Sequence, residues 1–228
     1  MPLVFFHGWG FSHTIWLSLA QALEKDYELY LVDLPGYGKS VSLDWESFKT
    51  ELLHQLPEAF AIAGWSLGGL FASRLTIEEP SHITHLVNIA SSPCFIRERD
   101  WPGVDKQVFA EFCSNLVAEP LETLMKFVGL QLNGQSLQKK HLSLPSALSL
   151  QEGLKILAEW DLREALGRIM KPTCFMFGRL DTITTRRTMA AMQARYPQFR
   201  YILFSKAAHM PFLAEQEMFI TCLREFVQ

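Results

Sequence analysis

Apolar residues form two alternating patterns along this chain. Short runs rich in Val, Ile, Leu and Phe are typical of buried strands, and they predict strands at residues 2–6, 27–33, 59–65, 84–90, 172–178 and 199–204. Apolar residues at helical spacing separate most of these runs, as in residues 15–23 and 48–56. This alternation of strands and helices indicates an α/β fold with a mainly parallel, doubly wound sheet.

The alternation is interrupted in the middle of the chain. Residues 93–168 carry helical patterns, such as 108–117 and 121–130, without a strand-like run. We therefore expect a core built from residues 1–92 and 169–228, with residues 93–168 inserted as a helical cap or lid. Because the first strand begins at residue 2, we expect that no strand pair precedes it in this sequence.

Composition and charge exclude several classes of function. A chain of 228 residues that is 49% hydrophobic can bury one domain-sized core. Its net charge of -3 gives no general attraction for nucleic acid or an anionic membrane. No apolar run approaches the roughly 18 residues that span a bilayer, and residues 1–7 have neither the basic n-region nor the small-residue cleavage site that are typical of a signal peptide. We expect a cytoplasmic protein that acts as a monomer.

Patterns typical of cofactor or metal sites do not occur in the sequence. The four cysteines are scattered without a C-x-x-C pair, which favours buried thiols over disulfides or zinc ligands. Residues 33–40 end in Gly-Lys-Ser, but Asp33 stands where a Walker A loop needs glycine, so this segment is interpreted as a turn. We expect neither a cofactor nor a bound metal.

One segment has the pattern of a nucleophile elbow. Gly64-Trp65-Ser66-Leu67-Gly68 follows a predicted strand and precedes a predicted helix, which is the context that this G-x-S-x-G motif requires. Small residues on both sides allow a sharp turn that exposes Ser66 at the start of the helix. Ser66 could instead be an ordinary helix N-cap, but the surrounding pattern favours a catalytic nucleophile.

A serine nucleophile needs a base and a carboxylate that orients the base. His209 lies between the last predicted strand and a helix that begins at Pro211, and Asp181 follows the strand at 172–178. Both therefore belong to loops at the carboxyl edge of the sheet. Asp161 is the rival carboxylate, but no strand precedes it, and capping or pairing near Arg163 is the simpler interpretation. The order Ser, Asp, His is the one that α/β-hydrolases use.

Backbone N–H groups must stabilise the negative charge that develops on the substrate oxygen. The amide of Leu67 follows the nucleophile directly, and the amide of Trp9 lies in His7-Gly8-Trp9-Gly10 after the first strand. We expect these two amides to form the oxyanion hole. His7 is interpreted as a structural ligand of its loop.

Together these motifs resemble those of the α/β-hydrolase superfamily, and several further segments resemble its biotin-synthesis esterases, which demethylate pimeloyl-[acyl-carrier protein] methyl ester. The segments that carry the closer resemblance are His7-Gly8-Trp9-Gly10, Gly64-Trp65-Ser66-Leu67-Gly68-Gly69, Ala90-Ser91-Ser92-Pro93-Cys94-Phe95, Trp101-Pro102-Gly103, Asp161-Leu162-Arg163 and Lys206-Ala207-Ala208-His209. They cover nearly the whole chain.

The resemblance implies an α/β-hydrolase fold and a serine carboxylesterase that releases methanol. It implies that Trp9 and Leu67 contact the substrate carbonyl, and that the acyl site is lined by Phe127, Val128, Gly129, Leu130 and Gln131. Basic cap residues, Lys126, Lys139 and Lys140, would bind the acidic acyl-carrier protein. Solvated lysines without a partner, and ordinary helix core for residues 127–131, remain alternatives.

Two other functions are compatible with parts of the sequence. A general short-chain carboxylesterase would use the same triad on small-molecule esters. A non-catalytic ligand-binding or carrier-binding module could share the fold, but it would have no need of the complete set of Ser66, Asp181 and His209.

Overall fold

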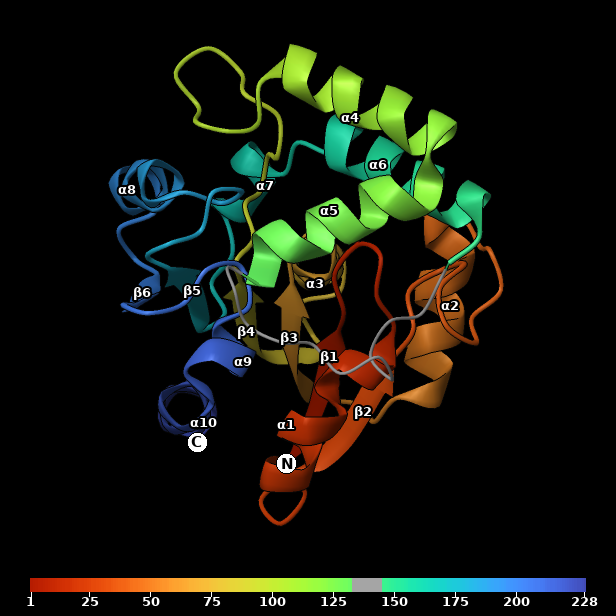
Figure 1. Cartoon of the computed structure of the whole chain (residues 1–228). Coiled ribbons are helices and arrows are strands. Elements are labelled where there is room, and N and C mark those ends of the chain that lie inside the picture. Colours follow the sequence, from red (N-terminus) through yellow and green to blue (C-terminus); the bar gives the residue numbers. More distant parts are fainter. Residues whose placement is uncertain (133–144) are drawn as a thin grey trace.

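The computed structural model describes residues 1–132 and 145–228. Six strands form a single sheet in the order β2-β1-β3-β4-β5-β6, and every neighbouring pair is parallel. The strands are β1 (Pro2–Phe6), β2 (Glu28–Val32), β3 (Phe60–Trp65), β4 (Ile83–Ile89), β5 (Thr173–Gly178) and β6 (Arg200–Phe204). Each lies within one residue of its predicted bounds, and the predicted parallel α/β fold is confirmed (Figure 1).

The position of each strand in the sheet explains its composition. β3 and β5 are buried along their whole length, whereas the edge strands β2 and β6 are largely half-buried. A parallel strand covered on both faces must be apolar throughout, which is why the central strands appear in the sequence as continuous apolar runs.

Helices connect and cover the strands. Those of the first part of the chain are η1 (His13–Trp16), α1 (Leu17–Leu23), α2 (Trp45–Gln55) and α3 (Leu67–Glu78). After β5 come α8 (Arg186–Arg195), α9 (Pro211–Ala214) and α10 (Gln216–Val227). The C-terminal helix α10 lies beside α1, where Arg224 Nη2 donates to the carbonyl of Ala22 at 3.1 Å.

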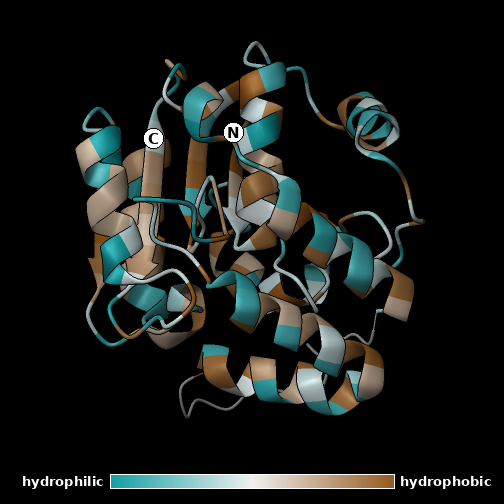
Figure 2. Ribbon diagram, turned by 90° about the horizontal axis from the view of Figure 1, so that it is seen from above, coloured by the Kyte–Doolittle hydropathy of each residue, from teal (hydrophilic) through white to brown (hydrophobic). Residues whose placement is uncertain are grey.

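Between β4 and β5, the described residues form helices and isolated bridges rather than further strands of the sheet. The helices are α4 (Lys106–Ala118), α5 (Pro120–Leu132), α6 (Ala147–Glu159) and the short α7 (Arg163–Leu166). Figure 1 places α4, α5 and α6 above the end of the sheet toward which the strands point. Figure 2 shows that these helices carry both hydrophobic and hydrophilic residues, in contrast to the mainly hydrophobic strands.

No helix in the described ranges combines the length and the apolar character that crossing a membrane requires.

Candidate active site

Ser66 occupies a strained turn between β3 and α3. Its φ of 54° and ψ of -116° are unusual for a residue with a side chain, and such strain is typical of functional sites. The turn is possible because its flanking glycines allow close packing. A Cβ atom on Gly64 would lie 2.7 Å from Gly69 Cα, and one on Gly68 would lie 2.5 Å from the carbonyl oxygen of His7.

His209 and Asp181 form a buried pair at the same edge of the sheet. His209 Nδ1 lies 2.7 Å from Asp181 Oδ2, and neither side chain is appreciably exposed. The loop that carries His209 is fixed by Trp65, whose indole N–H donates to the His209 carbonyl at 2.8 Å. Trp65, the sequence neighbour of Ser66, therefore also positions His209.

The loop after β5 holds Asp181 as a hydrogen-bond acceptor. Asp181 Oδ1 accepts the backbone N–H groups of Ile183 at 2.7 Å and Thr184 at 3.1 Å, and Oδ2 accepts the Thr184 hydroxyl at 2.6 Å. With its oxygens accepting from these donors, Asp181 leaves the proton of the His209 contact on Nδ1. In a neutral imidazole the other nitrogen, Nε2, then carries a lone pair.

Ser66 Oγ and His209 Nε2 are both without a hydrogen-bond partner among the described residues. His209 Nε2 is buried. Ser66 is 9% exposed, so the hydroxyl is shielded but reachable. The structure thus brings the three sequence-predicted residues to one edge, after β3, β5 and β6.

His7 is a structural ligand of the loop that follows β1, as its position in the sequence predicts. Its Nδ1 donates to the Gly8 carbonyl at 2.9 Å, and its Nε2 accepts the Leu34 N–H at 3.0 Å. Burial lowers the pKa of His7 to about 4, which keeps the ring neutral and able to accept.

A second tie to the same loop was not predicted. Asp33 Oδ1 accepts the N–H of His13 at 2.7 Å, and Oδ2 lies 2.8 Å from His13 Nδ1. Hydrogen bonds from the backbone of His13 and Lys39 hold the pKa of the Asp33 carboxyl below its ordinary value, against the opposing effect of burial. Residues 7–13 are therefore fastened at both ends to the turn at 33–40, which confirms the turn interpretation of that segment.

The backbone N–H groups of Trp9 and Leu67, which the sequence predicts as an oxyanion hole, both lack an acceptor in the described ranges. Leu67 is the first residue of α3, so its N–H has no acceptor within the helix. The Trp9 N–H makes no hydrogen bond with the described part of the chain. The Trp9 indole is held by α6, because its Nε1 donates to the Leu150 carbonyl of that helix at 2.8 Å.

The helices above the sheet pack directly on the Trp9 loop. The Trp9 ring lies edge-on to Phe112 of α4 and Phe127 of α5, with centroid distances of 5.5 and 5.3 Å. Tyr37 donates its hydroxyl to the carbonyl of Ser149 at 3.0 Å. This explains the buried Gly153, since a Cβ there would lie 2.7 Å from Trp9 Cδ1 and collide with the Tyr37 hydroxyl.

The five residues expected to line an acyl site do not share one environment. Val128 and Gln131 are buried and Phe127 is half-buried against Trp9. Gly129 and Leu130 lie on the outer side of α5, where the Leu130 side chain is 61% exposed. A pocket of about 430 Å³ lies nearby between α3, α6 and residues 35–45; its lining includes Leu67 but neither Ser66 nor His209.

Of the three lysines predicted to bind a carrier protein, only Lys126 is among the described residues. Lys126 is exposed on α5 and pairs with Glu122 at 2.6 Å, one turn earlier. Lys139 and Lys140 lie outside the described residues. Asp161, the rival carboxylate, pairs with Arg163 at 2.6 Å and accepts the Arg163 backbone N–H at 3.1 Å, which confirms the predicted pairing.

The remaining chemistry of the described residues is limited. All four cysteines are free, and Cys94 and Cys174 are buried. Burial raises the pKa of the Cys174 thiol to about 12, so this sulfur stays protonated. No group of three or more His, Cys, Asp or Glu side chains within the described ranges is arranged to hold a metal ion.

The fold and the arrangement of this edge define a class of protein. The chain belongs to the alpha/beta hydrolase family, whose model matches residues 3–220. It is therefore a hydrolase. Among solved structures it resembles the esterase EaEST from Exiguobacterium antarcticum, with a TM-score of 0.92, 23% identity, and coverage of 100% of this chain and 91% of the other. At that identity the likeness concerns the fold alone.

Sequence relatives identify a particular group within the family. The chain is 52% identical to the pimeloyl-[acyl-carrier protein] methyl ester esterase of Legionella pneumophila strain Corby, over 100% of this chain and 95% of the relative. The esterase of the same name from Klebsiella pneumoniae is 39% identical over 95% of this chain and 90% of the relative. The resemblance inferred from the sequence motifs is confirmed.

Proposed function

We propose that this protein is a serine carboxylesterase that hydrolyses the methyl ester of pimeloyl-[acyl-carrier protein] and releases methanol in biotin synthesis. The observation that carries the substrate assignment is the 52% identity, over the full chain, to a relative of that name. The hydrogen-bonded pair of His209 and Asp181 beside the strained Ser66 supports the reaction type. The reaction takes place in the cytoplasm, and the enzyme acts as a monomer without a cofactor.

The first half of the reaction transfers the acyl group to the enzyme. His209 Nε2 takes the proton of Ser66 Oγ as this oxygen attacks the ester carbonyl, and the Asp181 carboxylate stabilises the imidazolium that forms. The same proton then passes to the departing methoxy oxygen, so that methanol leaves. An acyl ester on Ser66 remains.

The second half restores the enzyme. Water gives a proton to His209 Nε2 and attacks the acyl carbonyl, and the proton returns to Ser66 Oγ as the free carboxylic acid is released. In both halves, the N–H groups of Trp9 and Leu67 donate to the oxygen that becomes negative. A preorganised donor of this kind is worth about 3 to 4 kcal/mol of the barrier.

Residues 93–168 would form the cap over this site, inserted into a core of residues 1–92 and 169–228. The apolar faces of Phe127 and Val128 would hold the aliphatic acyl chain, and the buried amide of Gln131 would meet its polar end. Lys126, with Lys139 and Lys140, would attract the acidic carrier protein. The Glu122 partner of Lys126 reduces the local positive charge, so carrier binding should rely on several lysines together.

The experiment that tests this function follows demethylation of pimeloyl-[acyl-carrier protein] methyl ester by mass spectrometry, beside hydrolysis of a p-nitrophenyl ester. Ser66→Ala should abolish both reactions. Ser114→Ala is the matched control, because Ser114 is exposed on α4 and bonds only the Ala110 carbonyl of its own helix.

Each outcome separates one part of the proposal from the rest. Efficient demethylation by wild type and Ser114→Ala, lost in Ser66→Ala, supports the whole assignment. Hydrolysis of the small ester alone would leave the triad intact and reject the carrier substrate in favour of a general short-chain carboxylesterase. Turnover that survives in Ser66→Ala would reject the serine mechanism.

A further inference from the structure

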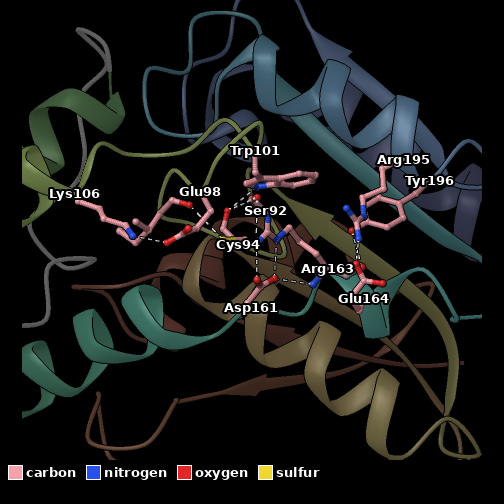
Figure 3. Close-up of polar contacts among 11 residues, drawn as sticks. Ser92, Cys94, Glu98, Trp101, Lys106, Asp161, Arg163, Glu164, Arg195 and Tyr196 are labelled. Carbon is pink, nitrogen blue, oxygen red and sulfur yellow. Dashed lines mark hydrogen bonds and ion pairs between the residues drawn. The ribbon is translucent and has the colours of Figure 1, made fainter.

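Three of the motifs found in the sequence take no part in the chemistry proposed above. They surround Cys94, Trp101 and Arg163, and the structure brings them together at one place (Figure 3). This place is the edge of a cleft of about 890 Å³, where the chain leaves β4 for the cap and where it returns from α6. We call Cys94, Trp101, Asp161 and Arg163 the cap anchor.

The segment that leads into the cap is held at one carbonyl. The Cys94 carbonyl accepts the Ser92 hydroxyl at 2.8 Å and the Trp101 indole N–H at 3.0 Å. Trp101 is buried, and its backbone pairs with that of Glu98. The loop is also tightly packed, because a Cβ atom on Gly103 would lie 2.5 Å from the Phe95 carbonyl oxygen.

The segment that leaves the cap is paired with the first one. Cys94 and Asp161 form an antiparallel bridge, and the Leu162 N–H donates to the Pro93 carbonyl at 2.8 Å. The Arg163 guanidinium binds both Asp161 oxygens, at 2.8 and 2.6 Å. Arg163 Cζ, the central carbon of the guanidinium, lies 5.6 Å from the centroid of the Trp101 ring.

A third contact joins this pair of segments to the core. Tyr196 follows α8 directly, and its hydroxyl donates to the Arg163 carbonyl at 2.8 Å. The ring centroids of Trp101 and Tyr196 lie 6.4 Å apart. The two ends of the cap are therefore fastened to each other and to the sheet layer by one cluster.

The arrangement favours a geometric role over a purely stabilising one. The Asp161 side chain is 47% exposed, and an ion pair so close to water contributes little stability. A planar guanidinium that binds both carboxylate oxygens and packs against an indole does, however, fix direction as well as distance.

The consequence lies at the other end of α6. This helix has 13 residues and ends at Glu159, next to the anchor, and its first turns supply the Ser149 and Leu150 carbonyls that bind Tyr37 and Trp9. A helix of that length is a rod of about 20 Å, so a tilt at its anchored end moves its contact with the Trp9 loop.

We propose that Trp101, Asp161 and Arg163 are positioning residues that set α6 and, through the Trp9 indole, place the Trp9 N–H for the oxyanion. This proposal rests on the proposed serine hydrolase mechanism. It does not depend on which ester is the substrate.

The experiment measures the hydrolysis of p-nitrophenyl acetate by wild type, Arg163→Gln, Arg163→Lys and Trp101→Phe. Titration of Ser66 with a fluorophosphonate gives the number of active sites, so that misfolded protein does not enter the rate. We expect kcat per titrated site to fall about tenfold or more in all three variants with little change in KM, because small displacements at a reacting centre are costly. Arg163→Lys keeps the charge but loses the two-point fork.

Arg187→Gln is the matched control. Arg187 is exposed on α8, and no hydrogen bond or ion pair joins it to Cys94, Trp101, Asp161 or Arg163, so the kcat per site of this variant should stay within twofold of wild type. Hydrogen exchange supplies a second readout. Relative to wild type, Trp101→Phe should speed the exchange of backbone amides in α6 more than in α3.

Normal kcat per site in Arg163→Gln and Trp101→Phe would overturn the proposal. If Arg163→Gln does not fold, Trp101→Phe decides alone, since it keeps an aromatic ring while it removes the N–H donor to the Cys94 carbonyl. If the serine mechanism itself is wrong, Ser66→Ala will still hydrolyse the small ester, so this failure is recognised separately. Failure of the carrier assignment leaves the small-ester result unchanged.

Discussion

At the scale of single residues, surroundings determine what a carboxylate can do. Asp181 is 5% exposed and accepts hydrogen bonds from its own loop and from His209. Asp161 lies at the surface and is occupied by Arg163. Only the first is placed to orient an imidazole, although the two residues are chemically identical.

Asp181→Asn should abolish most activity while preserving the shape of the site. An amide can donate to Nδ1 and favour the tautomer with the proton on Nε2, where it could no longer accept from Ser66. In a serine protease the equivalent change lowers kcat by about 10⁴, and we expect a loss of about 10³-fold or more on a p-nitrophenyl ester. Asp26→Asn, at the exposed pair with Arg224, is the control; similar rates for both variants would contradict the assignment.

His7 should make stability depend on pH. Burial lowers its pKa from 6.5 to about 4 in the folded protein, so between these values the unfolded chain binds more protons. The contribution of His7 to the free energy of unfolding is therefore fully present above about pH 6.5. It is lost as the pH drops toward 4, which lowers the stability by roughly 3 kcal/mol from this group alone. Urea unfolding at several pH values measures this slope.

His7→Gln provides the comparison for that slope. Glutamine does not titrate, so the variant should be less stable at neutral pH but should lose less on acidification than wild type. Replacing the exposed His54 by Gln should leave the wild-type slope in place. Equal slopes in wild type and His7→Gln would assign the acid sensitivity to other groups.

At the scale of elements, close backbone approach determines where glycine is required. Gly153 and Gly129 lie inside the helices α6 and α5, at positions where alanine is ordinarily the more favourable residue. Their surroundings differ completely. A Cβ atom on Gly153 would collide with Trp9 and Tyr37, whereas one on Gly129 would have no heavy atom within 4 Å.

Gly153→Ala should therefore destabilise the protein and Gly129→Ala should stabilise it. The first forces α6 away from the Trp9 loop, at a cost of about 1 to 3 kcal/mol that is typical of overpacking. The second removes conformational freedom from the unfolded chain and should add about 0.4 to 1 kcal/mol. Urea unfolding of both variants tests the difference in sign; stabilisation by Gly153→Ala would mean that α6 is not packed as described.

Local patterns predicted most elements because their signals are local. Apolar runs fixed the six strands to within one residue, and the strand-turn-helix context identified the Ser66 turn. The contacts of His13 with Asp33 and of Trp101 with Cys94 had no such signal. Each depends on the path of the chain between its partners, and neither has a periodicity in the sequence.

At the scale of the whole molecule, charge becomes relevant to the carrier protein. The net charge of -3 does not favour an acidic partner, so under the proposed function the attraction would come from a local group of lysines that includes Lys126. The exposed position of this side chain on α5 means that salt can screen its charge.

The KM for the carrier-bound ester should therefore rise with ionic strength, between about 0.05 and 0.5 M, as the screening length shortens. Lys126→Ala should raise the same KM severalfold and reduce its salt dependence, with kcat unchanged. Lys25→Ala, at an exposed position after α1, should change neither. Kinetics on the small ester complete the test, because an equal rise in its KM would indicate damage to the acyl site.

The sequence by itself determined the parallel α/β fold, the helical character of the described segments between β4 and β5, and the placement of Ser66, Asp181 and His209 after strands that end at one edge of the sheet. This was possible because parallel strands bring the loops after their carboxyl ends to the same side, whatever the details of packing. Family motifs added the resemblance to the biotin-synthesis esterases.

Only the tertiary structure decided how α4, α5 and α6 are seated on the Trp9 loop. The Leu150 carbonyl meets the Trp9 indole across 141 positions of sequence, and which face of α5 is buried follows from its packing on Trp9 and Phe112. Helical periodicity offers amphipathic faces but not their partners. Side-chain complementarity between distant segments selects those partners, and it exists only once the chain has folded.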